Sequence, residues 1–428
     1  MSVILMELQD RFSEALKEPI CDNCLGRCVG NLLSGMTNEQ RGRIIRGYMA
    51  FLLDSGKKLD VHMPNFHGTR FRELKAETGG HEECRTCNDF FLDKIEEVSR
   101  KAAKKLEGME FSTFLVGSIP TDEMRNREER LWDRVGVDYV EPIKSEINRE
   151  VGKRVEKIAG KKFDPKDPDI VVTVDLKRGE VRAQVRSLYV SGGYKKLVRG
   201  IPQTRWTCTG CGGKGCVECG GEGKRYKTSV HEIVGKPIMK AAGGKDHAFH
   251  GSGREDIDAR CLDYRPFVLE VVRPTKRGID LRKVGKTINR SKKVQVSGLE
   301  FSDKAHVRKI KADRHDKTYS AEVDFEEAVD RKMLPRLAKL KGAVISQQTP
   351  TRVKHRRADI LRKRGVKSFT IKLVGRRKAR IEVRAEAGMY IKELISGDGG
   401  RTRPSVAELL NNKVKRIVLD VTKIHKVR

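Results

Sequence analysis

Apolar residues recur at helical spacing in three segments near the start of the chain. Residues 2–17 and 38–53 both follow a period near 3.6, which predicts two amphipathic helices. A third helix is predicted over 89–106, directly after a pair of cysteines. In the second helix the expected buried face consists of Ile44, Ile45, Tyr48, Met49 and Leu52.

The next part of the chain, up to about Gly200, mixes strand and helix patterns. Residues 114–118 predict a strand, and 145–159 predict a helix with Ser145 as its N-cap. Residues 170–175 and 181–190 alternate apolar and polar positions, as half-buried strands do. This order, interleaved with basic residues, is typical of a small α+β RNA-binding domain.

Short strands dominate the second half of the chain. A helix is predicted over 229–240, and further helices intervene between the strands. The strands are predicted at 267–272, 294–297, 320–325, 369–374, 380–385 and 414–419. The pattern favours an α+β fold with one large mixed or mainly antiparallel sheet flanked by helices.

Length and charge limit the kinds of protein that the chain can be. At about 150 residues per domain, 428 residues suggest roughly two to three domains. A net charge of +31 favours a polyanionic partner such as RNA over a membrane surface. We find no apolar run near the roughly 20 residues of a membrane span, and no signal peptide. We therefore expect an intracellular, cytoplasmic protein.

Eight of the ten cysteines form pairs with two intervening residues. The pairs are Cys21 with Cys24, Cys84 with Cys87, Cys208 with Cys211, and Cys216 with Cys219. This spacing lets both thiolates of a pair bind one tetrahedral zinc, whereas disulfides suit a reducing cell less well. Two zinc sites with four thiolates each would be structural, because neither leaves an open position. Cys28 and Cys261 are expected to be packed thiols.

The four cysteines over 208–219 lie close together in a glycine-rich stretch, so they predict a compact zinc element at 205–225. The first four come from distant pairs. Their zinc would join the segment after the first helix to the start of the third.

Two basic segments allow alternative interpretations. Residues 191–196 (Ser-Gly-Gly-Tyr-Lys-Lys) resemble a pyrophosphate loop but lack its Asp-Ser, so a plain turn or an RNA phosphate contact is favoured. Residues 352–364 carry eight basic side chains interleaved with apolar ones. A solvated face is possible, but we favour an ordered element that grips RNA.

The segment 249–267 carries the strongest candidate chemistry. Four acids and three arginines follow a Gly-Ser-Gly turn just before an apolar run. A glycine turn at a strand edge can present a reactive carboxylate, although a solvated loop is the alternative. Asp258 and Asp263 are expected to pair with Arg254, Arg260 or Arg265.

Taken together, the motifs resemble the THUMP-containing tRNA pseudouridine synthases of archaea and eukaryotes, which modify uridines 54 and 55 of the T-loop. The resemblance covers nearly the whole chain. It rests on the cysteine pairs, Ile201-Pro-Gln-Thr-Arg-Trp, His250, Gly253-Arg-Glu-Asp-Ile-Asp-Ala-Arg, Arg265-Pro-Phe, Lys317-Thr-Tyr, Gln348-Thr-Pro-x-Arg-Val-x-His-Arg-Arg-Ala-Asp, Gly388-Met-Tyr-Ile-Lys-Glu-Leu and Gly397-Asp-Gly-Gly-Arg-Thr.

The resemblance implies a role for individual residues. Asp256 matches the catalytic aspartate of that family, and Tyr319 matches the tyrosine that stacks on the target base. The matching substrate-binding set comprises Tyr319, Tyr390, Lys392, Leu394, Arg254 and His250. Lys392 is expected to favour the charged form of Asp256. The resemblance also implies tRNA as partner and no catalytic cofactor. No obligate protein partner is evident, and one chain can act as a monomer.

The expected domains are residues 1–89, a helical zinc module; 90–200, a THUMP-like domain; and 201–428, the catalytic domain. Two other classes stay open. A non-catalytic zinc-containing RNA-binding or ribosome-associated protein would share the charge and the cysteines, but not the set of Asp256, Tyr319 and Lys392. Another THUMP enzyme, a methylase or a thiolase, would bind S-adenosylmethionine or ATP.

Overall fold

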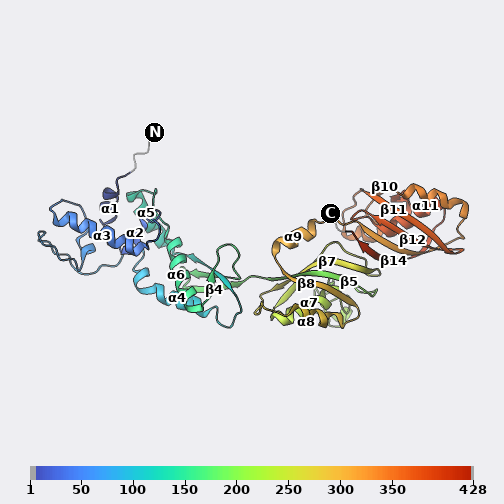
Figure 1. Ribbon diagram of the computed structural model, residues 1–428, viewed down its shortest axis with the longest axis horizontal. Helices are drawn as coiled ribbons and strands as arrows, with labels where there is room; N and C mark the ends of the chain where they lie inside the picture. Colours follow the sequence, from blue (N-terminus) through green and yellow to red (C-terminus); the bar gives the residue numbers. More distant parts are fainter. Residues whose placement is uncertain (1–5, 426–428) are drawn as a thin grey trace. The chain divides into compact units, whose positions relative to one another are not determined.

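Two compact units divide the chain between Arg186 and Ser187. The computed structural model describes residues 6–425. Figure 1 colours the first unit from blue to green and the second from green to red. Between residues 6 and 425, no helix is long and apolar enough to cross a membrane.

The first unit combines helices with a small mixed sheet. Its helices are α1 (Leu8–Ala15), α2 (Asp22–Arg27), α3 (Asn38–Asp54), α4 (Ile95–Lys104), α5 (Asp122–Val135) and α6 (Ile143–Ala159). Its strands are β1 (Thr113–Ile119), β2 (Lys162–Phe163), β3 (Ile170–Asp175) and β4 (Glu180–Val185). The strand order is β2-β1-β3-β4, with β1 parallel to β2 and β3, and β4 antiparallel to β3.

One hydrophobic core runs through the whole first unit. Its members include Phe12 of α1, Phe90 just before α4, Ile147 of α6 and Val172 of β3. The expected zinc module (1–89) and the start of the THUMP-like domain therefore share a core.

Several details of the first unit differ from the prediction. The first helix spans only Leu8–Ala15, and residues 2–5 lie outside the described part of the chain. In α3 the buried apolar side chains include Ile45 and Met49, whereas Ile44 and Tyr48 are exposed.

Two helix starts also differ. The third helix opens with a π-helical turn, Phe90–Lys94, before α4. Helix α6 starts at Ile143 after Pro142, so Ser145 lies inside it and is not the N-cap. The carboxylate of Glu128 accepts the Ile143 N–H at 2.6 Å, which is a tertiary contact that no local pattern shows.

A ten-stranded mixed sheet organises the second unit in the described chain. Its strands are β5 (Leu188–Lys196), β6 (Asp246–Gly251), β7 (Arg260–Val272), β8 (Val294–Ser302), β9 (Lys317–Phe325), β10 (Val344–Gln347), β11 (Arg362–Gly375), β12 (Lys378–Ala385), β13 (Thr402–Arg403) and β14 (Val414–Ile424). The order is β13-β10-β11-β12-β9-β14-β7-β5-β8, and β6 also pairs with β7. The predicted mixed, mainly antiparallel sheet is confirmed, because among these pairings only β7 and β14 run parallel.

Helices cover this sheet over two large cores and a smaller cluster. The helices are α7 (Val230–Ala242), α8 (Leu281–Asn289), α9 (Lys304–Ala312), α10 (Ile391–Ser396) and α11 (Val406–Leu410), with short 3₁₀ turns at Val217–Cys219, Arg331–Leu340, Thr351–Arg356 and Asp398–Gly400. One large core joins α7 and α8 to β5, β7 and β8; the other joins α10 and α11 to β9–β12. Helix α9 packs on the smaller cluster with Val268 of β7. Figure 1 shows α7 and α8 together beside the strands β5, β7 and β8. The two halves of the sheet meet where Arg260 and Cys261 of β7 pair with Asp420 and Val421 of β14.

Strand β5 corrects two expectations. Residues 191–196 form neither a turn nor a phosphate loop; they lie inside β5, between β7 and β8. Because β5 belongs to the second sheet, the units divide at Arg186 and not near Gly200. Gly192 and Gly193 are needed here, since a Cβ at either position would lie within 3 Å of Leu299 or Tyr264.

Candidate active site

The loop between β6 and β7 presents Asp256 at the junction of the two half-sheets. The loop turns at Gly253, where φ is +76°, a backbone conformation that glycine adopts without strain. A Cβ there would also lie only 3.1 Å from Nη1 of Arg265. The second glycine of the Gly-Ser-Gly turn is therefore required both by its backbone conformation and by the space that Arg265 occupies.

A buried lysine, Lys196, stabilises this loop through hydrogen bonds to its main chain. Lys196, at the end of β5, is fully buried, and its Nζ donates to the carbonyl oxygens of Ile201, Asp256 and Ile257 at 3.0, 2.9 and 3.2 Å. The main chain of Asp256 is thus fixed by a side chain that the sequence pattern assigned to a turn.

Glu255, which precedes Asp256 in the chain, is the centre of a second buried network. Nε of Arg265 lies 3.1 Å from Oε2 of Glu255, and the Tyr194 hydroxyl donates to the same oxygen at 2.9 Å. Arg265 also donates to the Ser252 carbonyl at 2.9 Å. Gln203 donates to the Gly253 carbonyl at 2.8 Å. Buried charges need such partners, and here they make the loop rigid.

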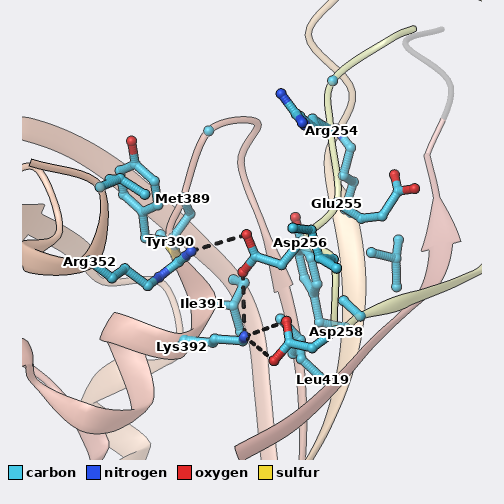
Figure 2. Close-up of a pocket in the computed structure, with 18 of the residues that line it drawn as sticks. Arg254, Glu255, Asp256, Asp258, Arg352, Met389, Tyr390, Ile391, Lys392 and Leu419 are labelled. Carbon is cyan, nitrogen blue, oxygen red and sulfur yellow. Dashed lines mark hydrogen bonds and ion pairs between the residues drawn. The ribbon is translucent and has the colours of Figure 1, made fainter. Parts of the chain in front are cut away.

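The Asp256 carboxylate lies between two cations. Nη1 of Arg352 donates to Oδ1 at 3.1 Å, and Nζ of Lys392 lies 3.6 Å from Oδ2 (Figure 2). Asp256 keeps a side-chain exposure of 32%, so a substrate can reach it. Arg352 is in turn held by Glu393, at 2.7 Å from its Nε. The structure confirms that Lys392 is near Asp256 and adds Arg352 as a closer partner.

The neighbouring acids pair differently from the prediction. Asp258 accepts from Lys392 at 2.7 and 2.8 Å (Figure 2), not from an arginine of its own segment. Burial tends to raise the pKa of Asp258, but the hydrogen bond and charge of Lys392 outweigh it and lower that pKa below its ordinary value. Asp263 accepts the backbone N–H groups of Tyr264 and Ile424. Both predicted pairings were wrong, because the fold and not proximity in the sequence sets the partners of these acids.

Both candidate tyrosines lie in the same cleft as Asp256. Tyr319 stands on β9, and burial raises its pKa to about 12, so it stays neutral. Tyr390 precedes α10, and its hydroxyl accepts from Arg357 at 3.0 Å. Its main chain is clamped by the buried Gln347, which donates to the Tyr390 carbonyl and accepts its N–H, both at 2.9 Å.

The cleft around these residues is large and cationic. Its volume is about 660 Å³, and Asp256, Asp258 and Glu255 are the acids of its lining. The basic side chains of the lining are Arg254, Arg265, Arg314, Lys317, Arg352, Arg357, Arg362, Arg364 and Lys392. A cleft of this size and charge suits a phosphate-bearing ligand.

Two residues of the expected substrate-binding set lie elsewhere. His250 stands on β6, where its Nε2 is 3.3 Å from the Glu270 carboxylate. Leu394 is fully buried in the core under α10. Neither is among the residues that line the cleft. Tyr319, Tyr390, Lys392 and Arg254, in contrast, come together with Asp256.

Sequence reasoning missed several residues of the site. Arg352 was noted in the basic stretch and in the Gln348-Thr-Pro-x-Arg motif, but no contact with Asp256 was predicted for it. Trp206 ended one of the family motifs and Leu419 ended a predicted strand, but neither they nor Lys196 were predicted to belong to the site. Lys317 is buried, and this burial, together with the charge of Arg265, lowers its pKa to about 8.

The positive charge is distributed unequally between the units. Residues 1–186 contain 33 Lys and Arg and 33 Asp and Glu, so residues 187–428 carry the whole net charge of +31. Long-range attraction for a polyanion therefore comes from the unit that holds the cleft.

Both cysteine quartets form groups that could hold zinc. In each, the four sulfur atoms lie within 4.8 Å of one another. Four of the sulfur–sulfur distances are 3.6, 3.7, 3.9 and 3.9 Å. A regular tetrahedron with Zn–S bonds of about 2.3 Å has edges of about 3.8 Å, so the sites fit the metal. Cys28 and Cys261 are buried and lie outside both groups, as expected.

The surroundings of each quartet suit thiolates. In the second, the backbone N–H groups of Gly215, Cys216 and Gly223 donate to sulfur atoms at 3.2 Å. In the first, the buried Arg27 donates to Cys24 Sγ at 3.2 Å. A zinc ion with four thiolates has a net charge of −2, which such donors compensate.

The α+β unit and the unit with the mixed sheet and cationic cleft match the two domains of pseudouridine synthases that carry a THUMP domain. The family model "Pus10, C-terminal" matches residues 189–425, and "Pus10 THUMP domain, archaeal" matches residues 98–175. The chain belongs to the Pus10 family.

Individual relatives agree with this assignment. The "tRNA pseudouridine synthase Pus10" of Methanothrix thermoacetophila is 46% identical over 94% of this chain and 91% of its own length. The protein of the same name from Methanopyrus kandleri is 42% identical over 96% of this chain and 97% of its own. Among solved structures, a Cbf5-Nop10-Gar1 complex matches 54% of this chain and 48% of that chain, with 17% identity and a TM-score of 0.30, too distant to add to the assignment.

Proposed function

We propose that the chain is a tRNA pseudouridine synthase that isomerises uridine 54, uridine 55 or both in the T-loop, with Asp256 as the catalytic carboxylate. The observation that carries the proposal is the position of Asp256. It is partly exposed, lies between Arg352 and Lys392, and shares one cleft with Tyr319. The relatives named above are tRNA pseudouridine synthases, which supports the substrate class.

The chemistry needs an anionic oxygen beside the sugar. Isomerisation breaks the bond between ribose C1′ and N1 and forms one between C1′ and C5. The C5 proton is lost, N1 gains a proton, and nothing is oxidised or reduced. A carboxylate can attack C1′, or remove a sugar proton to give a glycal. Arg352 and Lys392 contact the Asp256 carboxylate and hold it in place for either route.

The target base must leave its stack before Asp256 can reach its sugar. Extrusion costs a few kcal/mol. Stacking on an aromatic side chain such as Tyr319 can return about 1–3 kcal/mol. The cationic lining of the cleft binds the flanking phosphates, and the fixed main chain of Asp256 keeps its carboxylate at the sugar.

Zinc has a structural role in this proposal. The two cysteine quartets would each hold one ion, with no position left for substrate. The reaction itself uses no added cofactor.

The test is pseudouridine formation in tRNA transcripts by the purified protein without added cofactor. We expect conversion at the T-loop by the wild type and none by Asp256→Asn, which keeps RNA binding. Asp263→Asn is the matched control, since Asp263 does not line the cleft. If Asp256→Asn keeps its rate, the assigned role of Asp256 is wrong. If the wild type binds tRNA but never converts it, the non-catalytic RNA-binding protein replaces the enzyme.

A further inference from the structure

The compact cysteine element places an aromatic side chain at the edge of the catalytic cleft. Trp206 lies near the start of this element (205–225), just before its first cysteine, and lines the cleft together with Asp256 and Tyr319. The guanidinium carbon of Arg254 lies 5.4 Å from the centroid of the Trp206 ring, which is a cation–π distance. An indole in contact with a guanidinium thus lies in the same cleft as the Asp256 carboxylate.

The cysteine element holds Trp206 from both ends of its loop. The Trp206 carbonyl accepts the N–H of Arg225 at 3.0 Å. Thr207 pairs with Lys224 in an antiparallel bridge. The ring packs edge-to-face on Tyr226, with centroids 5.6 Å apart. These contacts close the base of the loop that carries all four cysteines.

The base of the loop is also tied to the protein core. Nζ of Lys224 lies 2.9 Å from Oε1 of Glu232 in α7, and Glu232 accepts from Ser229 at 2.9 Å. The position of Trp206 therefore depends on the closed loop, and closing the loop requires the cysteines to meet.

We propose that Trp206 and Arg254 form a binding site for a second nucleobase, the neighbour of the one that Asp256 acts on. The proposal rests on the proposed function, because it takes RNA as the ligand of the cleft. Unpaired bases stack on aromatic rings and on guanidinium planes, and both surfaces are present here. When the target base leaves its stack, its neighbour loses a stacking partner, and this site supplies a replacement.

The position fits a nucleotide next to the target. Arg254 and Asp256 are two residues apart, and two residues span at most about 7 Å of extended chain. In Figure 2 the Arg254 side chain points away from Lys392, so it faces a different part of the cleft from the partners of Asp256. One ligand can reach both places only if it extends beyond a single base.

The chain allows this site to be observed directly, because it contains only two tryptophans, Trp132 and Trp206. Trp132 lies in the first unit, packed against its core. In a Trp132→Phe variant, indole fluorescence comes from Trp206 alone. A T-arm RNA hairpin should quench or shift this emission at saturation. A hairpin with an abasic site at one of the two neighbours of the target uridine should bind without the signal.

The second measurement separates binding from chemistry. Trp206→Ala should raise KM for the hairpin by about 5- to 150-fold, the range of one lost stacking contact. At saturating RNA its kcat should stay within a few-fold of the wild type. Trp206→Phe, which keeps an aromatic face, should recover most of the loss. A purely structural role would predict loss of stability and kcat without this rescue.

Two results would overturn the second base site. One is unchanged Trp206 emission when gel shift shows that the RNA is bound. The other is an unchanged KM in Trp206→Ala. Failure of the proposed function looks different: the Trp132→Phe protein then forms no pseudouridine at any RNA concentration, whatever the fluorescence shows.

Discussion

Replacing Lys196 with methionine should separate the placement of Asp256 from its chemistry. The change keeps the length of the aliphatic stem but removes the ammonium group that contacts the loop carrying Asp256. Three carbonyl oxygens, those of Ile201, Asp256 and Ile257, then lose their donor. The carboxylate of Asp256 itself is untouched, because its partners are Arg352 and Lys392.

The magnitude follows from these contacts. Each hydrogen bond from a charged donor contributes about 1.5–3 kcal/mol. Burying the ammonium costs several kcal/mol, which the substitution regains in part. Burial indeed lowers the pKa of Lys196, against the opposing charge of Glu255. We expect a net loss of about 2–4 kcal/mol in the free energy of unfolding of the second unit. A loop shift of about 1 Å at a reacting group costs about 100-fold in rate.

The assay is single-turnover formation of pseudouridine in a tRNA transcript, at enzyme concentrations that saturate the RNA. We expect the rate constant of Lys196→Met to fall about 100-fold, with the RNA dissociation constant within about threefold of the wild type. Thermal unfolding measured in parallel shows that the variant is folded at the assay temperature.

The matched control is Lys195→Met, the same change one residue earlier in β5. Lys195 contacts the Tyr264 ring, 4.4 Å from its centroid, and does not touch the loop. It should keep the wild-type rate. A Lys196→Met protein that is folded and fully active would refute the idea that this lysine positions Asp256. An equal loss of rate in both variants would show that the substitutions act by disturbing strand β5 and not through the loop.

Three further predictions concern stability and metal content. Arg27→Met should destabilise the first unit by about 3–5 kcal/mol in chemical denaturation, because it leaves the buried Glu128 and Glu146 without their cation; a loss below 1 kcal/mol would contradict this. Burial and the adjacent His247 lower the pKa of His231 to about 4. The neutral imidazole therefore contributes its full stabilisation above pH 6.5, and the free energy of unfolding should fall by roughly 3 kcal/mol as the pH drops to 4. His231→Gln should flatten this dependence in melting curves recorded at different pH. Elemental analysis should find about two zinc ions per chain, and removing them should lower the melting temperature of both units; metal-free protein with unchanged melting would exclude the structural role.

Local patterns predicted most elements but not their ends. The helix at Asn38–Asp54 and the strands at Ile170–Asp175 and Lys378–Ala385 agree with the periodicity of the sequence. Strand β8 runs to Ser302, past the predicted end at 297, because pairing with β5 continues it. The start of α6 depends on the Glu128 carboxylate, which is distant in sequence.

The candidate site was likewise predicted only in part from the sequence. Cysteine spacing predicted both groups that could hold a metal, because two thiolates three residues apart can bind one ion. The motifs marked Asp256, Tyr319 and Lys392 as a set, and the fold brings them into one cleft. The sequence did not predict which acid pairs with which base, nor that Leu394 and His250 lie outside the cleft.

Spacing, charge and motif order along the chain thus determined the family, the two cysteine quartets and the loop that carries Asp256, since each depends on residues close together or on composition. Only the tertiary structure decided that Arg352 contacts Asp256, that Lys196 supports the loop from β5, and that Trp206 borders the cleft. These contacts join strands and turns that are far apart in the sequence. Their energies come from burial and pairing across the sheet, which no local pattern encodes.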